Sequence, residues 1–249
     1  MKFTNQVAIV TASAGAGIGQ ATARALAQEG ASIVVTDVHP KRTNTVAEDI
    51  AATHKVATLA VVCDVTDPIQ VDNLIKLALE KFGKIDMLVN NAGFDIATPH
   101  VDLDMETLTR IVNITLMGTF YTTKAVLPTM IKQGKGGIVN LSSMAAYTPD
   151  VSDSAVYCAS KAGVVAFTRK LAREVGKHNI RVNAIAPGVV MNPFLEKVMP
   201  REELDEMVDR FMSLGRAGVP EDIAKAIVFL LSEEAGFISG VTLPVAGGW

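Results

Sequence analysis

The sequence has few cysteines, few aromatic residues and no strong excess of one charge, and each of these absences excludes a class of protein. Its two cysteines, Cys63 and Cys158, are too few for a disulfide framework and too far apart for a Cys-x-x-Cys metal or redox site. We therefore expect no metal site and a reducing, cytoplasmic compartment. A net charge of −3 and 5% aromatic residues provide neither the basic surface nor the stacking platforms of a nucleic-acid-binding protein.

The sequence also lacks any long hydrophobic run. No apolar stretch approaches the roughly 20 residues that a membrane-spanning helix needs, and the first residues show no signal-type cleavage pattern. We find no linker, internal repeat or low-complexity tract. With 49% of its 249 residues apolar, the chain has enough length and apolar content for one domain with a substantial core.

Short apolar runs alternate with longer amphipathic stretches along the whole chain. In the longer stretches apolar residues recur at three- and four-residue intervals, which is typical of surface helices. The short runs are apolar on both faces, which favours a parallel sheet covered by helices on each side. The simplest such fold is α/β: a Rossmann-type, doubly wound sheet of seven strands in a single domain. The predicted strands span residues 7–12, 32–37, 56–64, 85–91, 136–143, 180–187 and 241–246.

A glycine-rich stretch, TASAGAGIG at residues 11–19, follows the first predicted strand. In a doubly wound sheet, ligands bind beyond the carboxyl ends of the strands, and this turn lies there. Gly15, Gly17 and Gly19 would let the backbone approach a pyrophosphate, and a helix beginning near Gly17 would direct its free N–H groups at the anion. Taken alone, the glycines are equally compatible with an ordinary strand-to-helix bend.

Asp37 ends the second predicted strand, at a distance of about 20 residues from the turn. A carboxylate there can accept hydrogen bonds from both hydroxyls of an adenosine ribose and would repel a 2′-phosphate, so it favours NAD over NADP. The nearby His39, Lys41 and Arg42 keep NADP possible, although a solvated helix start also explains the two longer side chains. The alternative for Asp37 is a solvated charge at a strand end.

Four further blocks follow in order: VNNAG at residues 89–93, IVNLSS at 138–143, YCASK at 157–161 and VNAIAPG at 182–188. Together with the glycine turn, they resemble the short-chain dehydrogenase/reductase family over essentially the whole chain. The resemblance implies one NAD(P)-binding domain over residues 1–249. It also implies an enzyme that transfers hydride reversibly between nicotinamide and a ketone or secondary alcohol, similar to 3-oxoacyl reductases or hydroxysteroid dehydrogenases.

Tyr157 and Lys161 are four residues apart in a helical pattern, so they lie on the same helix face. A phenol with a pKa of about 10 is a poor acid–base catalyst at neutral pH. An ammonium within about 4–6 Å favours the phenolate and lowers that pKa, which makes proton transfer possible. The alternative is a surface Tyr and Lys on an amphipathic helix.

The resemblance assigns two more catalytic positions, Ser143 and Asn113. Ser143 ends the fifth predicted strand and would hydrogen-bond the substrate oxygen, while Ser142 would point to the opposite face. The interval from Ser143 to Tyr157 is one residue longer than is usual in the family, so Ser142 remains a rival. Asn113 would support a water that links Lys161 to solvent; the alternative is a helix-interior Asn bonded to the local backbone.

The resemblance also implies cofactor contacts, with two departures from the family pattern. Asn192 replaces the usual threonine, and in the glycine turn Ala12 replaces the first glycine while one residue is added. An alanine at positive φ would be strained, so the simplest account moves the flexible position to Gly15. The implied contacts are Ser13, Gly15, Gly17, Ile18, Gly19, Asp37, Asp64, Val65, Asn91, Ala92, Gly93, Tyr157, Lys161, Pro187, Gly188 and Val190.

Residues 188–216 form an irregular stretch that corresponds to the family's variable, substrate-covering segment. Its apolar residues, Phe194 among them, would contact an apolar or acyl-thioester substrate together with Phe94, Ser143 and Tyr157. The alternative is that the apolar residues of this segment only pack it onto the domain.

The last residues, ISGVTLPVAGGW, resemble the family's closing strand, which commonly meets a neighbouring subunit. We therefore expect a homo-oligomer, a tetramer or a dimer, with Trp249 as an interface anchor. We expect a small-molecule substrate and no nucleic-acid or membrane partner. The alternative function is a catalytically idle relative that uses a bound dinucleotide as a sensor or scaffold, and the altered turn and Asn192 keep it open.

Overall fold

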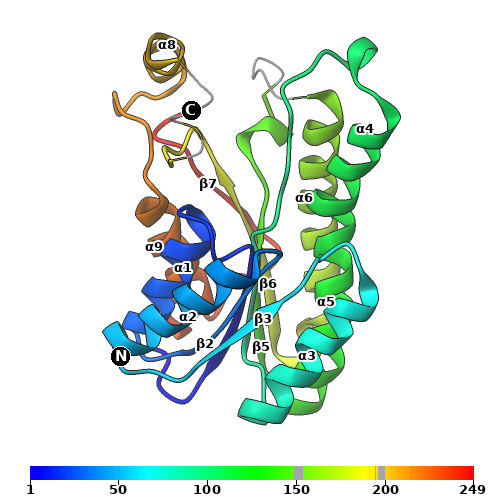
Figure 1. The fold of residues 1–249 in the computed structure, drawn as a ribbon, viewed down its shortest axis with the longest axis vertical. Helices are drawn as coiled ribbons and strands as arrows, with labels where there is room; N and C mark the ends of the chain where they lie inside the picture. The colour runs from blue at the N-terminus through cyan, green and yellow to red at the C-terminus, as the bar shows by residue number, and fades with distance from the viewer. Residues whose placement is uncertain (149–153, 194, 196–199) are drawn as a thin grey trace.

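The structure of the chain, a computed structural model, describes residues 1–148, 154–193, 195 and 200–249 (Figure 1). The strands are β1 (Val7–Thr11), β2 (Ser32–Asp37), β3 (Thr58–Val62), β4 (Met87–Asn90), β5 (Gly136–Leu141), β6 (Ile180–Pro187) and β7 (Thr242–Val245). The α-helices are α1 (Ile18–Gln28), α2 (Pro40–His54), α3 (Pro68–Phe82), α4 (Met105–Val112), α5 (Gly118–Gln133), α6 (Ala155–Val175), α8 (Arg201–Phe211) and α9 (Pro220–Leu231).

The described strands form one parallel, seven-stranded sheet in the order β3-β2-β1-β4-β5-β6-β7. The chain runs outward from β1 to β3, returns to the centre at β4, and runs outward again to β7. The order therefore reverses between β1 and β4, where Val10 is aligned with both Val35 and Val89. In doubly wound folds ligands bind beyond the carboxyl ends of the strands at this reversal. The predicted Rossmann-type sheet is confirmed.

Helices cover both faces of the sheet and make three layers (Figure 1). One core lies between the sheet and α1, α2 and α9, and the other lies between the sheet and α3, α5 and α6. Alternate strand residues contribute to opposite cores: in β1, Ala8 and Val10 belong to the first, and Val7 and Ile9 to the second. This two-sided burial explains why the predicted strands are apolar on both faces.

Local signals in the sequence determine where the helices begin and end, as α3 illustrates. Asp67 caps its N-terminus by accepting a hydrogen bond from the N–H of Ile69 at 2.9 Å, and Pro68 occupies the first helical position. Gly83 ends the helix in a left-handed conformation, with φ of 73°. Among the helices that the structure describes, none combines the length and the apolar character needed to span a membrane.

Candidate active site

The turn between β1 and α1 contains a left-handed alanine. Ala12 has a φ of 51°, whereas Gly15 lies outside the positive-φ region. The expectation that Gly15 takes over the flexible position is therefore wrong. The positive φ lies instead at Ala12, the position where the family has its first glycine. A residue with a Cβ costs about 1–2 kcal/mol in this conformation.

Hydrogen bonds from the end of β4 hold this turn in place. Asn91 Nδ2 donates to the carbonyl oxygens of Thr11 at 3.0 Å and Ala12 at 3.2 Å. Thr11 Oγ1 accepts from the N–H groups of Asn91 at 2.9 Å and Ala92 at 3.0 Å. Asn91, predicted to contact the cofactor, thus also positions the glycine turn. The sequence analysis missed Thr11, although a polar residue at the end of an apolar strand was a usable signal.

We expect Ala12→Gly to stabilise the protein, because glycine adopts a positive φ without a Cβ clash. The gain is about 0.5–1 kcal/mol, since the greater freedom of glycine in the unfolded chain offsets part of the relief. It corresponds to a rise in melting temperature of about 1–4 °C for a chain of this size. Calorimetry checks this against Ala16→Gly, a control in the same loop outside the positive-φ region. If Ala12→Gly lowered the melting temperature and Ala16→Gly did not, the proposed backbone strain at Ala12 would be contradicted.

The N-terminus of α1 fits a bound pyrophosphate. Gly17 is the N-cap residue and provides no side-chain cap, so the first N–H groups of the helix lack an intrahelical acceptor. A Cβ added at Gly15 or Gly17 would meet no atom of the described residues within 4 Å. Open space beside free N–H groups and the positive end of the helix dipole suits the phosphates of a dinucleotide. Ile18, at the start of the helix, borders the catalytic cavity described below.

Gly19 and Ser13 have structural roles in the turn. A Cβ on Gly19 would lie 2.5 Å from the carbonyl oxygen of Ala12, so glycine is needed for the close packing of α1 against the turn. The Ser13 hydroxyl is buried, donates to the Val10 carbonyl at 2.7 Å and accepts from the Thr36 N–H at 3.2 Å. Its side chain therefore joins β1 and β2 and does not face the space predicted for the cofactor.

A large cavity of about 840 Å³ opens at the carboxyl ends of β1, β2 and β3. The Asp64 carboxylate on its wall accepts hydrogen bonds from the N–H and the hydroxyl of Thr66, at 2.9 and 2.8 Å. This volume suits an adenosine group, and most of the residues predicted to hold one line it. The predicted residues on its wall are Asp37, Asp64, Val65, Ala92, Gly93, Phe94 and Asn113.

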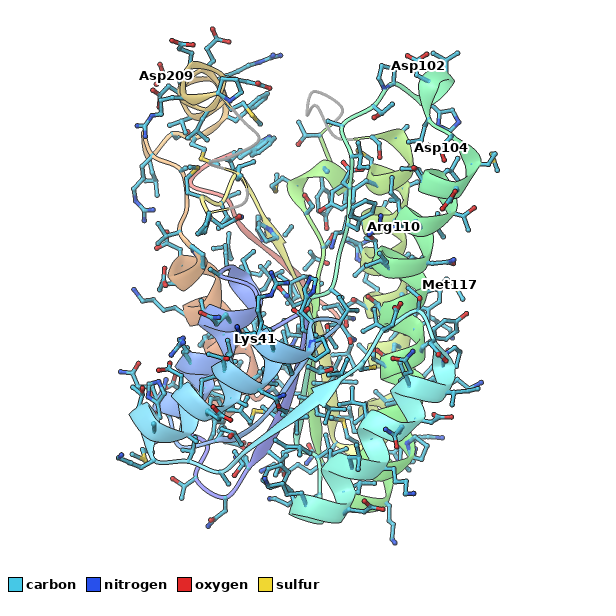
Figure 2. All side chains as sticks on the ribbon, viewed as in Figure 1. Lys41, Asp102, Asp104, Arg110, Met117 and Asp209 are labelled. Atoms are coloured by element: carbon cyan, nitrogen blue, oxygen red, sulfur yellow. The ribbon has the colours of Figure 1, made fainter. Side chains whose placement is uncertain are left out.

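Asp37 is held by the backbone on the wall of the large cavity. Its carboxylate accepts hydrogen bonds from the N–H groups of Ala14 and His39, each at 3.3 Å. The half-exposed Arg42 places Nη2 4.0 Å from Asp37 Oδ1. Lys41 lies nearby at the start of α2 (Figure 2). The Asp37 carboxylate, which favours NAD, and the cations of Arg42 and Lys41, which could pair with the 2′-phosphate of NADP, therefore lie close together.

Cys63 also lines the large cavity, as a neutral thiol. Burial raises its pKa to about 12, and the carboxylates of Asp64 and Asp67 add to the rise. Since a thiol must ionise to act as a nucleophile or metal ligand, Cys63 contributes only shape to the cavity at neutral pH.

A smaller cavity, of about 360 Å³, adjoins the large one at Gly93, which borders both. We call it the catalytic cavity because Ser143, Tyr157 and Lys161 all line it. The structure therefore brings together three of the four predicted catalytic residues, from the segment after β5 and from α6. Other predicted cofactor contacts that line the catalytic cavity are Asn91, Pro187, Gly188 and Val190.

Lys161 is buried beside the Tyr157 ring. Its side chain is 3% exposed, and its Nζ donates to the carbonyl oxygen of Leu141 at 2.6 Å. The same nitrogen lies 5.5 Å from the centroid of the Tyr157 ring. An ammonium in this position favours the phenolate over the phenol, and low exposure strengthens the interaction because little water screens it.

The two candidate serines differ in what their hydroxyls contact. Ser142 is buried, and its Oγ donates to the carbonyl oxygen of Lys161 at 3.1 Å, which ties β5 to α6. Ser143 is partly exposed, and its Oγ accepts from the Ala145 N–H at 3.1 Å at the start of a short 3₁₀ turn, η3 (Met144–Ala146). This arrangement favours Ser143 as the residue that contacts a substrate oxygen.

Asn113 lies where α4 gives way to a π-helical turn, η2 (Asn113–Met117). The N–H of Gly118 bonds to the Asn113 carbonyl, five residues back, and such turns are frequent at functional sites. Asn113 lines the large cavity and is not among the residues that line the catalytic cavity. The structure thus places this predicted catalytic residue beside the cofactor space, while η2 packs against α6.

Phe94 is likewise on the large cavity, away from the predicted substrate contacts Ser143 and Tyr157. The guanidinium of Arg110, on α4 (Figure 2), lies 4.2 Å from the centroid of the Phe94 ring. The Thr115 hydroxyl lies 3.2 Å from both the N and the O of Phe94, which fixes the backbone there. The structure therefore places Phe94 on the wall of the large cavity, and its predicted contact with the substrate stays a prediction.

The segment predicted to cover the substrate is anchored at its base. Val190 pairs with Gly218 in a short parallel bridge. Asn192 accepts a hydrogen bond from the Leu195 N–H at 3.1 Å, so its amide organises the start of the segment. Phe194, predicted to contact the substrate, lies outside the residues that the structure describes.

Helix α8 packs the described part of this segment onto the domain. Leu204 and Val208 are buried in a small cluster that also includes Val189. The Phe211 ring stacks on Trp249, with centroids 4.6 Å apart and an interplanar angle of 18°. These contacts support the alternative in which apolar residues of α8 stabilise the segment itself.

A buried polar network that the sequence analysis missed lies beneath the site. Asn90 Nδ2 donates to Thr123 Oγ1 at 2.9 Å and to Asn140 Oδ1 at 2.8 Å. Asn140 Nδ2 in turn donates to Thr168 Oγ1 at 2.9 Å. The network joins β4 and β5 to α5 and α6, so it fixes the helix of Tyr157 relative to the sheet. An asparagine inside each of two otherwise apolar strands was the available signal.

Comparison with known proteins gives full-length similarities. The family model described as enoyl-(acyl carrier protein) reductase matches residues 12–249. The chain is 36% identical to 3-oxoacyl-(acyl-carrier-protein) reductase FabG of Thermotoga maritima, covering 100% of this chain and 99% of the relative. It is 36% identical to 7alpha-hydroxysteroid dehydrogenase of Escherichia coli K12, covering 100% and 95%. The crystal structure of NAD+-bound xylitol dehydrogenase superposes with a TM-score of 0.92 at 33% identity, covering 100% of both chains.

Proposed function

Because the chain belongs to the short-chain dehydrogenase/reductase family, we propose that it transfers hydride reversibly between NAD and a ketone or secondary alcohol at the catalytic cavity. The named relatives are dehydrogenases and reductases, which confirms the predicted enzyme class. The observation that carries the proposal is that Ser143, Tyr157 and Lys161 share one cavity. That cavity joins the larger, cofactor-sized cavity at Gly93.

The chemistry assigns each residue a step. A bound nicotinamide supplies the hydride in reduction and accepts it in oxidation. In reduction, the Tyr157 O–H gives its proton to the substrate oxygen while Ser143 hydrogen-bonds the same oxygen and stabilises its developing charge. The Lys161 ammonium stabilises the phenolate that Tyr157 becomes. Asn113, through a bound water, would help return a proton to Tyr157, and oxidation runs these steps in reverse.

We propose NAD as the preferred cofactor. The Asp37 carboxylate, 9% exposed and oriented by two backbone N–H groups, is placed to accept hydrogen bonds from ribose hydroxyls and to repel a 2′-phosphate. The NAD+-bound xylitol dehydrogenase shares the fold over its whole length, which is compatible with this choice.

We expect Asp37→Ser to shift the preference from NAD toward NADP. The substitution removes a charge that repels the 2′-phosphate and leaves Arg42 and Lys41 to pair with it. Like charges in contact cost several kcal/mol, so the ratio of kcat/KM values for NAD and NADP should fall by about 100-fold or more. Steady-state kinetics with both cofactors measures the ratio. The control is Asp49→Ser, which removes the same charge from an exposed position on α2. If both variants had the same NAD-to-NADP ratio of kcat/KM, the assignment of Asp37 as the residue that selects NAD would be contradicted.

We propose that the substrate is an apolar ketone or alcohol, or an acyl thioester, covered by residues 188–216. The support is the similarity to a 3-oxoacyl reductase and to a hydroxysteroid dehydrogenase. A panel of ketones, β-keto thioesters, steroid alcohols and sugar alcohols, each with NAD(H) and NADP(H), tests it. Turnover of sugar alcohols alone would contradict the substrate class, and no turnover at all would contradict the enzyme.

We further propose a cytoplasmic homo-oligomer, a tetramer or a dimer. Phe237 is fully exposed and Val241 is partly exposed beside the edge strand β7. Exposed apolar residues at a sheet edge are typical of a surface that a partner covers. Trp249, predicted as an interface anchor, stacks on Phe211 of its own chain, so only the part that this contact leaves open can meet a neighbour.

A further inference from the structure

Tyr157 lies in the first turn of α6, where a helix is least stable. The first N–H groups of any helix lack intrahelical acceptors, so this turn frays unless other groups hold it. Ser154 is the N-cap residue, and its Oγ accepts a hydrogen bond from the N–H of Tyr157 itself at 3.3 Å. The position of the phenol therefore depends on how firmly Ser154 is held.

Asp95 holds Ser154 with two hydrogen bonds. The Ser154 hydroxyl donates to Asp95 Oδ1 at 2.5 Å, and the Ser154 N–H donates to Asp95 Oδ2 at 3.1 Å. Ser154 is only 2% exposed and Asp95 is partly buried, so water competes with these bonds less than it would at an open surface. Hydrogen bonds to a carboxylate are the stronger kind. The first turn of α6 contains no acidic residue, so Asp95 also supplies the negative charge that a helix N-terminus favours.

We call the two hydrogen bonds between Asp95 and Ser154 the clamp. Asp95 belongs to residues 93–95, a segment that borders both cavities at Gly93. Asp95 follows Gly93, which borders both cavities, and Phe94, whose N and O both lie within hydrogen-bond distance of the Thr115 hydroxyl. A methyl group on Gly93 would lie 3.3 Å from Lys161 Nζ. One short backbone segment thus contacts the cofactor space, the catalytic lysine and, through Asp95, the turn of Tyr157.

We propose that Asp95 is a positioning residue that, through Ser154, fixes the Tyr157 phenol relative to the segment lining the cofactor cavity. Asp95 does not touch the reacting atoms; it aligns the group that does. Misplacement of a catalytic group by about 1 Å can cost about 100-fold in rate. This inference rests on the proposed function, in which Tyr157 is the proton donor.

Kinetics of Asp95 and Ser154 variants test the positioning role. We expect Asp95→Ala to lower kcat by about 10- to 100-fold while the dissociation constant of NADH changes by less than about twofold. Asp95→Asn keeps one acceptor oxygen and should restore kcat to within about fivefold of the wild type. Ser154→Ala should lower kcat as Asp95→Ala does, and the double variant should be no worse than either single variant, because both break the same link.

A control separates positioning from stability. Asp86 directly precedes β4, at the amino ends of the strands and therefore far from Tyr157; it is buried, and its carboxylate accepts a hydrogen bond from the Val7 N–H at 2.8 Å. We expect Asp86→Ala to lower the melting temperature and leave kcat at the wild-type value. Equal kcat losses in Asp86→Ala and Asp95→Ala would overturn the proposal, as would a wild-type kcat in Asp95→Ala. If Asp95→Ala does not fold, Asp95→Asn and Ser154→Ala decide the question.

Hydrogen exchange distinguishes a failure of this inference from a failure of the proposed function, because it needs no turnover. We expect amides of residues 155–161 to exchange at least about tenfold faster in Asp95→Ala than in the wild type or Asp86→Ala. Unchanged exchange in this turn would overturn the clamp even if the enzyme is active. Faster exchange in a protein that turns over no substrate would leave the clamp standing and contradict the proposed chemistry.

Discussion

Replacing Tyr157 with phenylalanine is expected to reduce turnover by about 100- to 10,000-fold while cofactor binding persists. General acid–base catalysis contributes about 10²–10⁴-fold in rate, and the variant removes the only O–H assigned to that step. The aromatic ring remains, together with its packing beside Lys161, whose Nζ lies 5.5 Å from the ring centroid. The fold and the cofactor cavity should therefore stay intact.

Two measurements on the same preparation check this result. Turnover is measured with the substrate that the panel identifies, and NADH affinity is measured by its fluorescence on binding. Tyr121→Phe, the same chemical change on α5 in a partly buried position, is the matched control and should retain wild-type turnover. Substantial activity in Tyr157→Phe would refute Tyr157 as the proton donor, and Ser143 would then be the first residue to examine.

The fold was predictable from the sequence because it depends on regular, local signals. Each strand is buried on both faces, so its apolar residues are consecutive, and proline, glycine and capping residues punctuate the helices that follow. Asp67, Pro68 and Gly83 mark the bounds of α3 to within a residue. The seven predicted runs correspond to the seven strands because their interiors are apolar, and the functional residues within them, such as Asp37, lie at the strand ends.

The site was predictable only in part, because its details depend on contacts between distant segments. The co-localisation of Ser143, Tyr157 and Lys161 follows from strand ends and a four-residue helical spacing. The conformation of Ala12 does not, since it depends on hydrogen bonds from Asn91, about 80 residues away in the sequence. A local rule about alanine and positive φ gave the wrong position because tertiary contacts outweigh an intrinsic cost of about 1–2 kcal/mol.

The placement of Phe94 shows a second limit. It follows Gly93, which borders both cavities, yet Phe94 itself lines the large cavity. Thr115 contacts its backbone and Arg110 its ring, and both residues lie on the α4–η2 stretch. Sequence spacing alone contains no information on these contacts.

Gly19→Ala is expected to destabilise the protein and weaken cofactor binding, although alanine is the better helix former. Intrinsic propensity favours the substitution by about 1 kcal/mol. The added Cβ would, however, lie 2.5 Å from both the Ala12 carbonyl oxygen and Asn91 Nδ2. Overpacking of this kind costs about 1–3 kcal/mol beyond the gain, because a backbone carbonyl cannot move aside without moving the turn. The melting temperature should fall by about 2–10 °C.

Gly17→Ala provides the contrast that makes the experiment decisive. Gly17 has a φ of −145°, which any residue adopts, and within the part of the chain that the structure describes its Cβ would meet no atom within 4 Å. Its melting temperature should fall by no more than about 2–4 °C, since alanine is a weaker N-cap residue than glycine by about 1 kcal/mol. The methyl group would nevertheless occupy the space proposed for the pyrophosphate, so the dissociation constant of NADH should rise by about tenfold or more.

The two variants separate the roles of two glycines only two residues apart. Gly19→Ala should lose both stability and affinity, because it displaces the turn, whereas Gly17→Ala should lose mainly affinity, because its methyl group meets the ligand and leaves the turn in place. Calorimetry gives the melting temperature of each variant, and NADH titration gives its dissociation constant. The structure predicts how the two variants rank in each measurement. Wild-type affinity in Gly17→Ala would show that the phosphates do not lie against the N-terminus of α1, and the cofactor would then have to bind by the large cavity alone.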